Sequence, residues 1–377
     1  MKIGIVCYPT FGGSGVVATE LGMALADKGH EVHFITYNQP VRLDFLSHKL
    51  HFHQVLIEEY PLFQYQPYEL ALSSKMVEVV KRYNLEVLHV HYAIPHAYAA
   101  YMAKQMLKEK GINVKVVTTL HGTDITLVGS HPTYKTAVEF SINNSDVVTA
   151  VSNNLKETTN QLFNINKEIQ VVYNFIDTKK YDRVQNEECK RGALAKTDER
   201  IITHISNFRP VKRIEDVVRI FYEIQKEVPS KLLLIGEGPD RKKAEQLTKE
   251  LNIKQHVFFL GNSTEIDKIL CYTDLFLLPS NTESFGLAAL EAMAARTAVI
   301  STNAGGLPEV NIHGETGYLS NIGDINDMAM NAISILKEDA ILEQFKNNAK
   351  EHTKKFSLQN ILPVYEDIYK SCYKSKV

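Results

Sequence analysis

The sequence lacks the features typical of a disulfide-bonded secreted domain or of a membrane protein. Its four cysteines, Cys7, Cys189, Cys271 and Cys372, are far apart in the sequence. They lack the close spacing that is typical of metal sites and of disulfide frameworks. No apolar stretch approaches the length of a membrane span, and Pro9 and nearby glycines interrupt the short apolar run at the N-terminus. We therefore expect a cytoplasmic protein with no stable membrane association.

An excess of charge of one sign is also lacking. The chain has 42 Lys and Arg against 44 Asp and Glu, so its formal net charge is -2. This balance provides no global positive field for nucleic acid, and a bound anion must be held by local groups. At 377 residues the chain exceeds the size that one core usually serves. We expect two domains and small-molecule partners, while the oligomeric state, a homo-oligomer included, stays open.

Strand-like runs alternate with helical patterns in the first part of the chain. Strands are expected at KIGIVCY, EVHFITY, VLHVHY and VKVVTTLH, and helices at residues 16–28 and near 70–83. Short β-rich runs separated by helices of this length imply parallel strands with right-handed crossovers. This part therefore predicts one Rossmann-like sheet.

The same alternation restarts after VVYNFIDTKKYD, with strands expected at RIITHIS, KLLLIGEG, HVFFLG, LFLLPS and AVIST. The fold class is therefore α/β, with two Rossmann-like parallel-sheet domains facing across a cleft. We expect the helix after Phe356 to cross back onto the first domain. The expected domains are 1–165 plus 357–377, and 166–356.

The segment NTESFGLAALE, residues 281–291, predicts a binding site for a nucleotide sugar. It follows the strand LFLLPS, so its Ser-Phe-Gly turn opens a helix whose unpaired N–H groups suit a diphosphate. Glu291 could bond a ribose diol, and Glu283 a second polyol. Taken alone, the segment is equally explained by a capped surface helix with two solvated carboxylates.

Three further loops follow strands of the same expected sheet. SNFRPVKR contains Arg209 and Lys212, GEGPD begins at Gly236, and NAGGLPE contains Gly305 and Gly306. Ligand sites on such sheets lie at the carboxyl ends of strands, where Lys or Arg can neutralise a diphosphate. The alternatives are a solvated basic turn and tight connections.

The loop GGSGVVATELG raises the alternative of a dinucleotide site, because Gly13, Gly15 and Ala18 match G-x-G-x-x-[G/A]. Such a site needs an acidic residue at the end of the second strand to bind the ribose. This chain instead has Thr36, Tyr37 and Asn38 there. The glycines are better explained by close approach of a ligand or by a tight turn.

The motif HGTD follows the strand VKVVTTL and places His121 at a strand end. An imidazole there can bond a sugar hydroxyl or stabilise charge, and Asp124 could orient it. His89 is expected inside a strand and His96 at a helix start. No His or carboxylate pair shows metal-ligand spacing on a helix, so we expect no metal.

Together, these motifs resemble the retaining GT-B glycosyltransferases of family 4. GGSG, HGTD, the Lys212 loop, GEGP, E-x7-E and GGLPE occur in the family's order over essentially the whole chain. The resemblance implies catalytic roles for His121, Lys212 and Glu283. It implies a donor site formed by Gly13, Asn207, Arg209, Lys212, Ser284, Phe285, Gly286, Leu287 and Glu291.

The chain departs from the family pattern at one of these positions. The family usually has an arginine five residues before Lys212, and this chain has Asn207 there. Arg209 could supply the missing guanidinium. The individual roles of Asn207 and Arg209 therefore stay open.

Finer features, including CYPTFGGSGVVATELG, HVHYAIPHA, TTLHGTDIT and VVYNFID, are similar to one branch of that family. Its members transfer N-acetylglucosamine (GlcNAc) from UDP-GlcNAc to the hydroxyl of L-malate in bacillithiol biosynthesis. The resemblance implies UDP-GlcNAc and L-malate as substrates. A small dianion would then lie where four side chains converge, those of Ser14, Tyr92, Thr119 and Asn153.

The family analogy implies transfer with retention at the anomeric carbon and without metal or other cofactor. Lys212, Arg209 and helix N–H groups would stabilise the departing diphosphate. Three alternatives stay open. They are a family 4 enzyme with a lipid or polyol acceptor, a sugar-nucleotide epimerase, and a non-enzymatic sensor of sugar nucleotides.

Overall fold

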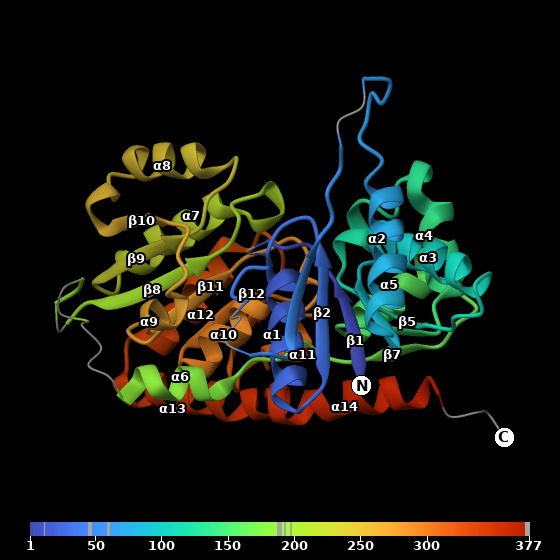
Figure 1. The fold of residues 1–377 in the computed structure, drawn as a ribbon. Helices are drawn as coiled ribbons and strands as arrows, with labels where there is room; N and C mark the ends of the chain where they lie inside the picture. The colour runs from blue at the N-terminus through green and yellow to red at the C-terminus, as the bar shows by residue number, and fades with distance from the viewer. Residues whose placement is uncertain are drawn as a thin grey trace. The chain divides into compact units, whose positions relative to one another are not determined.

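The computed structural model describes residues 1–10, 12–43, 47–58, 61–186, 191, 194–196 and 198–373 (Figure 1). The chain forms two compact units, Met1–Asn174 with Gln359–Val377, and Phe175–Leu358. Among the described residues, none of the helices is long and apolar enough to cross a membrane.

The first unit is built on a seven-stranded parallel sheet with the order β3-β2-β1-β4-β5-β6-β7. Its strands are β1 Lys2–Val6, β2 Glu31–Thr36, β3 Leu50–Gln54, β4 Val87–His91, β5 Lys115–Leu120, β6 Val147–Ala150 and β7 Ile169–Val171. The apolar runs predicted β1, β2, β4 and β5. The edge strand β3 was not predicted, because its sequence LHFHQ has little apolar content.

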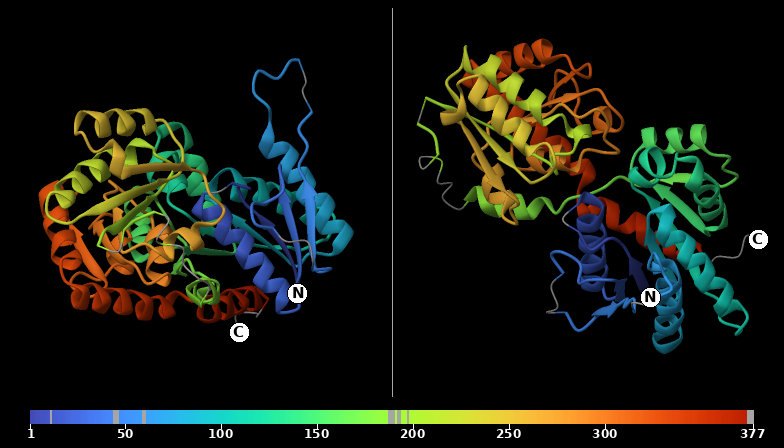
Figure 2. Two further views of the ribbon diagram at one scale, coloured as in Figure 1. Left: turned by 90° about the vertical axis from the view of Figure 1, so that its left-hand side faces the viewer. Right: turned by 90° about the horizontal axis from the view of Figure 1, so that it is seen from above.

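Helices cover both faces of this sheet (Figure 2). They are α1 Gly13–Asp27, α2 Tyr68–Tyr83, α3 Tyr98–Lys108, α4 Pro132–Asn144 and α5 Asn153–Leu162, with short helical segments η1 Ala93–Ala97 and η2 Thr123–Leu127. On one face, Leu72 and Met76 of α2 pack with Ile35 and Leu88 of the sheet. On the other, α1 lies so close to β2 that a Cβ on Gly22 would be 2.3 Å from the Phe34 ring.

The second unit repeats this plan with a six-stranded parallel sheet in the order β10-β9-β8-β11-β12-β13. Its strands are β8 Arg200–Ile205, β9 Ser230–Ile235, β10 Val257–Gly261, β11 Leu275–Leu278, β12 Ala298–Thr302 and β13 Gly317–Ser320. Its helices are α6 Thr178–Asn186, α7 Ile214–Gln225, α8 Arg241–Glu250, α9 Ile266–Leu270, α10 Leu287–Ala294, α11 Leu307–Val310, α12 Ile325–Leu336 and α13 Asp339–His352, with η4 Pro210–Lys212, η5 Lys254–His256 and η6 Thr353–Phe356.

The last helix, α14 Leu358–Ser371, belongs to the first unit from Gln359 onward. Its Tyr369 hydroxyl lies 2.8 Å from Nδ1 of His89 in β4. Its Glu366 carboxylate lies 2.9 Å from Nε2 of His30. The division between the units falls after Asn174 instead of after residue 165, because β7 pairs with β6 in the first sheet.

Both sheets reverse the order of their strands at one point. In the first sheet β1 lies between β2 and β4, and in the second β8 lies between β9 and β11. At such a switch point the connections after the two central strands run to opposite faces, which leaves a crevice at their carboxyl ends. The loops after β1 and β4, and after β8 and β11, are therefore the places to look for ligand-binding groups.

We predict that Tyr369→Phe lowers the free energy of unfolding by about 1–2 kcal/mol, because it leaves a buried His89 nitrogen without its partner. Tyr373→Phe is the matched control, since the Tyr373 hydroxyl donates to the Glu86 carbonyl at an exposed position. Its cost should stay within about 0.5 kcal/mol. Equal losses in urea unfolding would contradict the importance of the buried contact.

Candidate active site

In the second unit, the loops after β8 and β11 are joined by an ion pair. Lys212, the last residue of η4, donates from Nζ to Oε1 of Glu283. The same oxygen accepts a hydrogen bond from Oγ of Ser280 at 2.9 Å. The backbone N–H of Asn281 donates to the Val211 carbonyl at 2.8 Å. The two residues that the sequence singled out from different loops therefore meet at the switch point.

The close spacing of these loops depends on glycines that contact a neighbouring loop. Gly305 has φ +58°, and a Cβ there would lie 2.0 Å from the Glu283 carbonyl oxygen. The N–H of Gly306 donates to that same oxygen at 2.8 Å. A Cβ on Gly238 would lie 2.0 Å from the Asn207 oxygen. These glycines therefore allow loops of the site to pack closely against one another.

The turn before α10 has the expected strand–turn–helix geometry. Gly286, with φ +97°, immediately precedes the first helical residue, Leu287. Phe285 is buried and its ring packs edge-on against Phe356 at 5.5 Å, so it offers the site backbone groups. Glu291 is only 8% exposed. Its burial rules out the alternative in which both carboxylates of the segment are solvated.

In the loop after β8, two polar residues are exposed on either side of a buried phenylalanine. Phe208 is fully buried with φ +39°, while Asn207 and Arg209 on either side are exposed. The guanidinium of Arg213 is engaged within the unit, by Asp216 at 2.5 Å and by Asn281 at 3.1 Å. Arg209 is therefore the better placed of the two arginines to meet a ligand.

In the first unit, a hydroxyl pair occupies the corresponding switch point. Oγ of Ser14, in the first turn of α1, lies 2.6 Å from the hydroxyl of Tyr92, which follows β4. Burial raises the pKa of Tyr92 above its ordinary value, so its phenol stays protonated. Gly13 begins α1, and a Cβ on Gly15 would lie 2.5 Å from the Tyr8 carbonyl oxygen. The α1 N-terminus is thus set closely against the loop after β1.

His121 is held beside this pair by another histidine. It is 8% exposed, its ring lies 5.2 Å from the Tyr92 ring, and its Nε2 is 2.8 Å from Nδ1 of His91. Burial, followed by the nearby His96, lowers the pKa of His121 to about 3. The imidazole is therefore neutral near pH 7 and can act as a hydrogen-bonding group.

Asp124 was expected to orient the ring of His121, but among the hydrogen bonds of the described residues its carboxylate reaches only the backbone N–H of His121, at 3.3 Å, and not the imidazole. Its carboxylate accepts hydrogen bonds from the backbone N–H groups of Ala93 at 2.8 Å and Gly122 at 2.9 Å. Burial raises the pKa of Asp124 to about 6 despite these bonds. Asp124 therefore ties the loop after β5 to the loop after β4, and His91 takes the orienting role.

The side chains of Thr119 and Asn153, the other two residues of the expected acceptor set, bond to groups other than Ser14 and Tyr92, although the Thr119 carbonyl accepts a hydrogen bond from the Tyr92 N–H at 2.9 Å. Thr119 is fully buried, and its hydroxyl lies 2.7 Å from both His89 Nε2 and Thr149 Oγ1. It lies in β5, two residues before His121, which directly follows the strand, so Thr119 belongs to a buried layer below the site. Asn153 is exposed at the start of α5 and donates to the Tyr173 hydroxyl at 2.9 Å.

An aromatic cluster around Tyr92 was not predicted from the sequence. The Tyr8 ring lies 5.2 Å from that of Tyr92 and 4.6 Å from that of His96, and Tyr68 lies 6.4 Å from His96. Among the described residues, no hydrogen-bond partner is found for three buried atoms of this region, His91 Nε2, His96 Nε2 and Tyr68 Oη. The sequence signal that could have predicted this cluster was the alternation of His89 and His91 at the end of β4.

Two family models match this chain, one over each half. Residues 11–180 match the model described as Glycosyltransferase Family 4, and residues 185–352 match the model described as Glycosyl transferases group 1. The chain is 50% identical to N-acetyl-alpha-D-glucosaminyl L-malate synthase of Bacillus anthracis, over 98% of this chain and 96% of that relative.

Solved structures show the same fold at low identity. Sucrose-phosphate synthase from Thermosynechococcus elongatus matches with a TM-score of 0.80 and 22% identity, over 99% of both chains. Anabaena HepE, solved in complex with UDP-glucose, matches with a TM-score of 0.77 and 20% identity, over 98% of this chain and 100% of that one. The expected pair of parallel-sheet α/β domains is therefore confirmed.

We predict that stability falls as the pH falls below about 6.5, because the histidines of this region are buried in their neutral form. Burial lowers the pKa of His89 and His121 to about 3 and that of His96 to about 4. The unfolded chain takes up protons near pH 6.5, whereas the folded protein does not. The stabilisation is thus complete above about pH 6.5 and is lost as the pH falls through about 4 to 3.

Urea unfolding at about pH 7.5 and about pH 5 would measure this dependence. The replacement His121→Gln removes one such group and should flatten the curve. A free energy of unfolding that is equal at both pH values would contradict the buried neutral state.

Proposed function

Because the chain belongs to the family 4 glycosyltransferases, which have the GT-B fold, we propose that it transfers GlcNAc from UDP-GlcNAc to the hydroxyl of L-malate. The observation that carries this proposal is the 50% identity to the Bacillus anthracis synthase over nearly the full length of both chains. Family membership removes the epimerase and sensor alternatives. Acceptors such as lipids or polyols are distinguished by the experiment below.

We propose that the second unit binds the donor. Lys212 and Arg209 would neutralise the diphosphate together with the backbone N–H groups before α10, as in other anion sites at helix N-termini. Glu291, buried in α10, would accept hydrogen bonds from the ribose. The arriving diphosphate would compete for the Lys212 ammonium, which releases Glu283 to bind a hydroxyl of the sugar.

The first unit would bind the acceptor. The hydroxyls of Ser14 and Tyr92 and the N–H groups of the first turn of α1 suit a small carboxylate. Neutral His121, held by His91, would hydrogen-bond the sugar or the acceptor hydroxyl without adding a positive charge to the site. Two buried atoms supply further polar groups, His96 Nε2 beside Tyr92 and Tyr68 Oη beside His96.

The proposed reaction retains the anomeric configuration. The bond between the anomeric carbon and the diphosphate oxygen breaks, and the bond to the malate hydroxyl oxygen forms on the same face of the sugar. The hydroxyl proton passes to the departing diphosphate, whose charge Lys212 and Arg209 stabilise. This chemistry asks for no metal or other cofactor, and we propose that it takes place in the cytoplasm.

Incubation with UDP-GlcNAc and a panel of acceptors, followed by UDP release, tests the proposed acceptor. We expect release with L-malate to be at least about tenfold faster than with D-malate, which presents its carboxylates differently to the same site. Glycerol and lipid vesicles are the other arms. NMR of the product should show the anomeric configuration of the donor. Release with another acceptor but not with L-malate would refute the acceptor and leave the family assignment intact.

Replacement of Lys212 tests the donor site. We expect Lys212→Ala to lower kcat by about 100-fold to 1000-fold, because the charge of the leaving diphosphate loses its partner. Lys242→Ala is the matched control, since Lys242 is exposed on α8 of the same unit. Steady-state rates of UDP release give both values. Near-normal turnover of Lys212→Ala would contradict the proposed role.

A further inference from the structure

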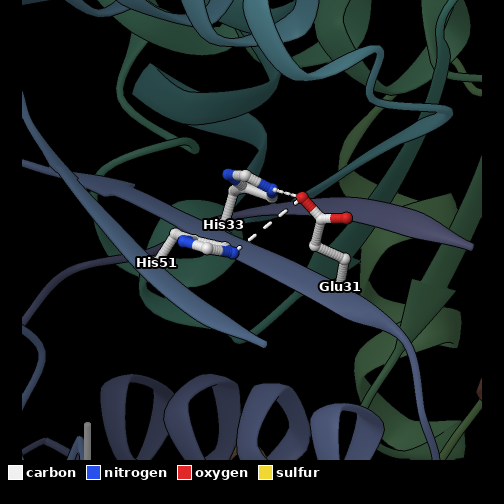
Figure 3. A group of neighbouring side chains, drawn as sticks. All are labelled: Glu31, His33 and His51. Carbon is white, nitrogen blue, oxygen red and sulfur yellow. Dashed lines mark hydrogen bonds and ion pairs between the residues drawn. The ribbon is translucent and has the colours of Figure 1, made fainter. Parts of the chain in front are cut away.

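A group of three histidines and one carboxylate lies at the outer edge of the first sheet. Glu31 and His33 come from β2, and His51 and His53 come from the edge strand β3. His33 is paired directly with His51 in the strand register. Because side chains alternate along a strand, these four residues share one face of the sheet. Figure 3 shows Glu31, His33 and His51 with their polar atoms directed toward one another.

The distances within this group suit a metal ion. Oε1 of Glu31 lies 3.1 Å from Nε2 of His33 and 3.9 Å from Nε2 of His51. All three ligand atoms lie within 4.8 Å of one another. Zinc bonds of about 2.0–2.1 Å in tetrahedral geometry place neighbouring ligand atoms about 3.4 Å apart. Small side-chain rotations would therefore bring the three atoms onto one ion.

We propose that Glu31, His33 and His51 bind a single Zn²⁺ ion. Two imidazoles and one carboxylate form a ligand set typical of zinc, and nitrogen ligands disfavour Mg²⁺ and Ca²⁺. His51 and Glu31 are about one-third exposed, at 35% and 32% of their side chains, so a water molecule can complete the coordination. The sequence analysis missed this site because it looked for ligand spacing on helices, whereas these residues lie on neighbouring strands.

The surroundings of His33 support this role. Its Nδ1 lies 2.8 Å from Nε2 of His53, and its side chain is fully buried. Metal-bound histidines usually have such a partner: with the ion bound, Nδ1–H of His33 would donate to His53, and Nε2, which now contacts Glu31, would bind the ion. The ring of Tyr83 packs on His33 at 4.5 Å and on His53 at 5.1 Å. The central ligand is therefore held in place before any ion arrives.

One positive charge competes for this carboxylate. Lys2 Nζ lies 3.2 Å from Oε2 of Glu31, whereas the proposed ion takes the other oxygen, Oε1. The carboxylate can therefore hold both, although Lys2 lowers the affinity for the ion. Arg82 contributes a more distant charge, with its guanidinium 5.5 Å from the centre of the Tyr83 ring.

The bound ion would join the edge strand β3 to its neighbour β2. β3 has a neighbour on one side only, and the ion would link its His51 to Glu31 and His33 of β2. Glu31 and His33 lie at the amino end of β2, whereas Ser14, Tyr92 and His121 follow the carboxyl ends of their strands. The ion would thus stabilise the acceptor unit without entering the transfer reaction, and the inference does not rest on the proposed function.

Calorimetric titration of the untagged, chelator-treated full chain with Zn²⁺ tests the site. We expect one ion per chain in the wild type, and thermal unfolding should shift upward by roughly 5 °C when zinc exceeds its dissociation constant about 100-fold. Co²⁺ should give the visible absorption of a tetrahedral site. The rate of UDP release from the chelated protein should equal that of the zinc-loaded protein at a temperature where both are folded.

Matched variants separate this site from adventitious binding. His51→Gln and Glu31→Gln remove one ligand each and should weaken zinc binding at least about tenfold. His48→Gln is the control, since His48 is exposed three residues before His51 and outside the group. The proposal is overturned if the wild type shows no stoichiometric binding, or if His51→Gln binds zinc as tightly as His48→Gln.

Discussion

The order of the strands in the two parallel sheets is the constraint on which the rest of this structure depends. Each sheet reverses its order once, at β1/β4 in the first unit and at β8/β11 in the second. Because every strand is parallel, all carboxyl ends lie at one edge, and the reversal sends neighbouring connections to opposite faces. The resulting crevice is where backbone N–H groups and loop side chains are left available for a ligand.

At each switch point a pair of polar side chains joins the two central loops. In the first unit this is the hydroxyl pair of Ser14 and Tyr92, and in the second it is the ion pair of Lys212 and Glu283. Such pairs hold their groups in position at modest net gain, since each partner gives up water to reach the other. A ligand with matching charge or hydroxyls can therefore replace one partner at little cost.

Beneath the first of these pairs lies a layer of buried polar groups. His89 contacts both Thr119 and Tyr369, so it connects β5 to α14 across the strand β4. Burying such groups is tolerated only because they are hydrogen-bonded, and the same burial keeps the histidines neutral. The layer explains why a threonine near the end of a strand supports the site from below without reaching its surface.

The sequence by itself determined the alternation of strands and helices, the two-domain division and the motifs at strand ends, because apolar periodicity and loop chemistry are local properties. Lys212 and Glu283 could be singled out in this way. Only the tertiary structure decided which loops meet, since strand order depends on packing between distant segments. It placed His91 against His121, buried Thr119, and set His51 beside His33, because each of these neighbours comes from a different strand.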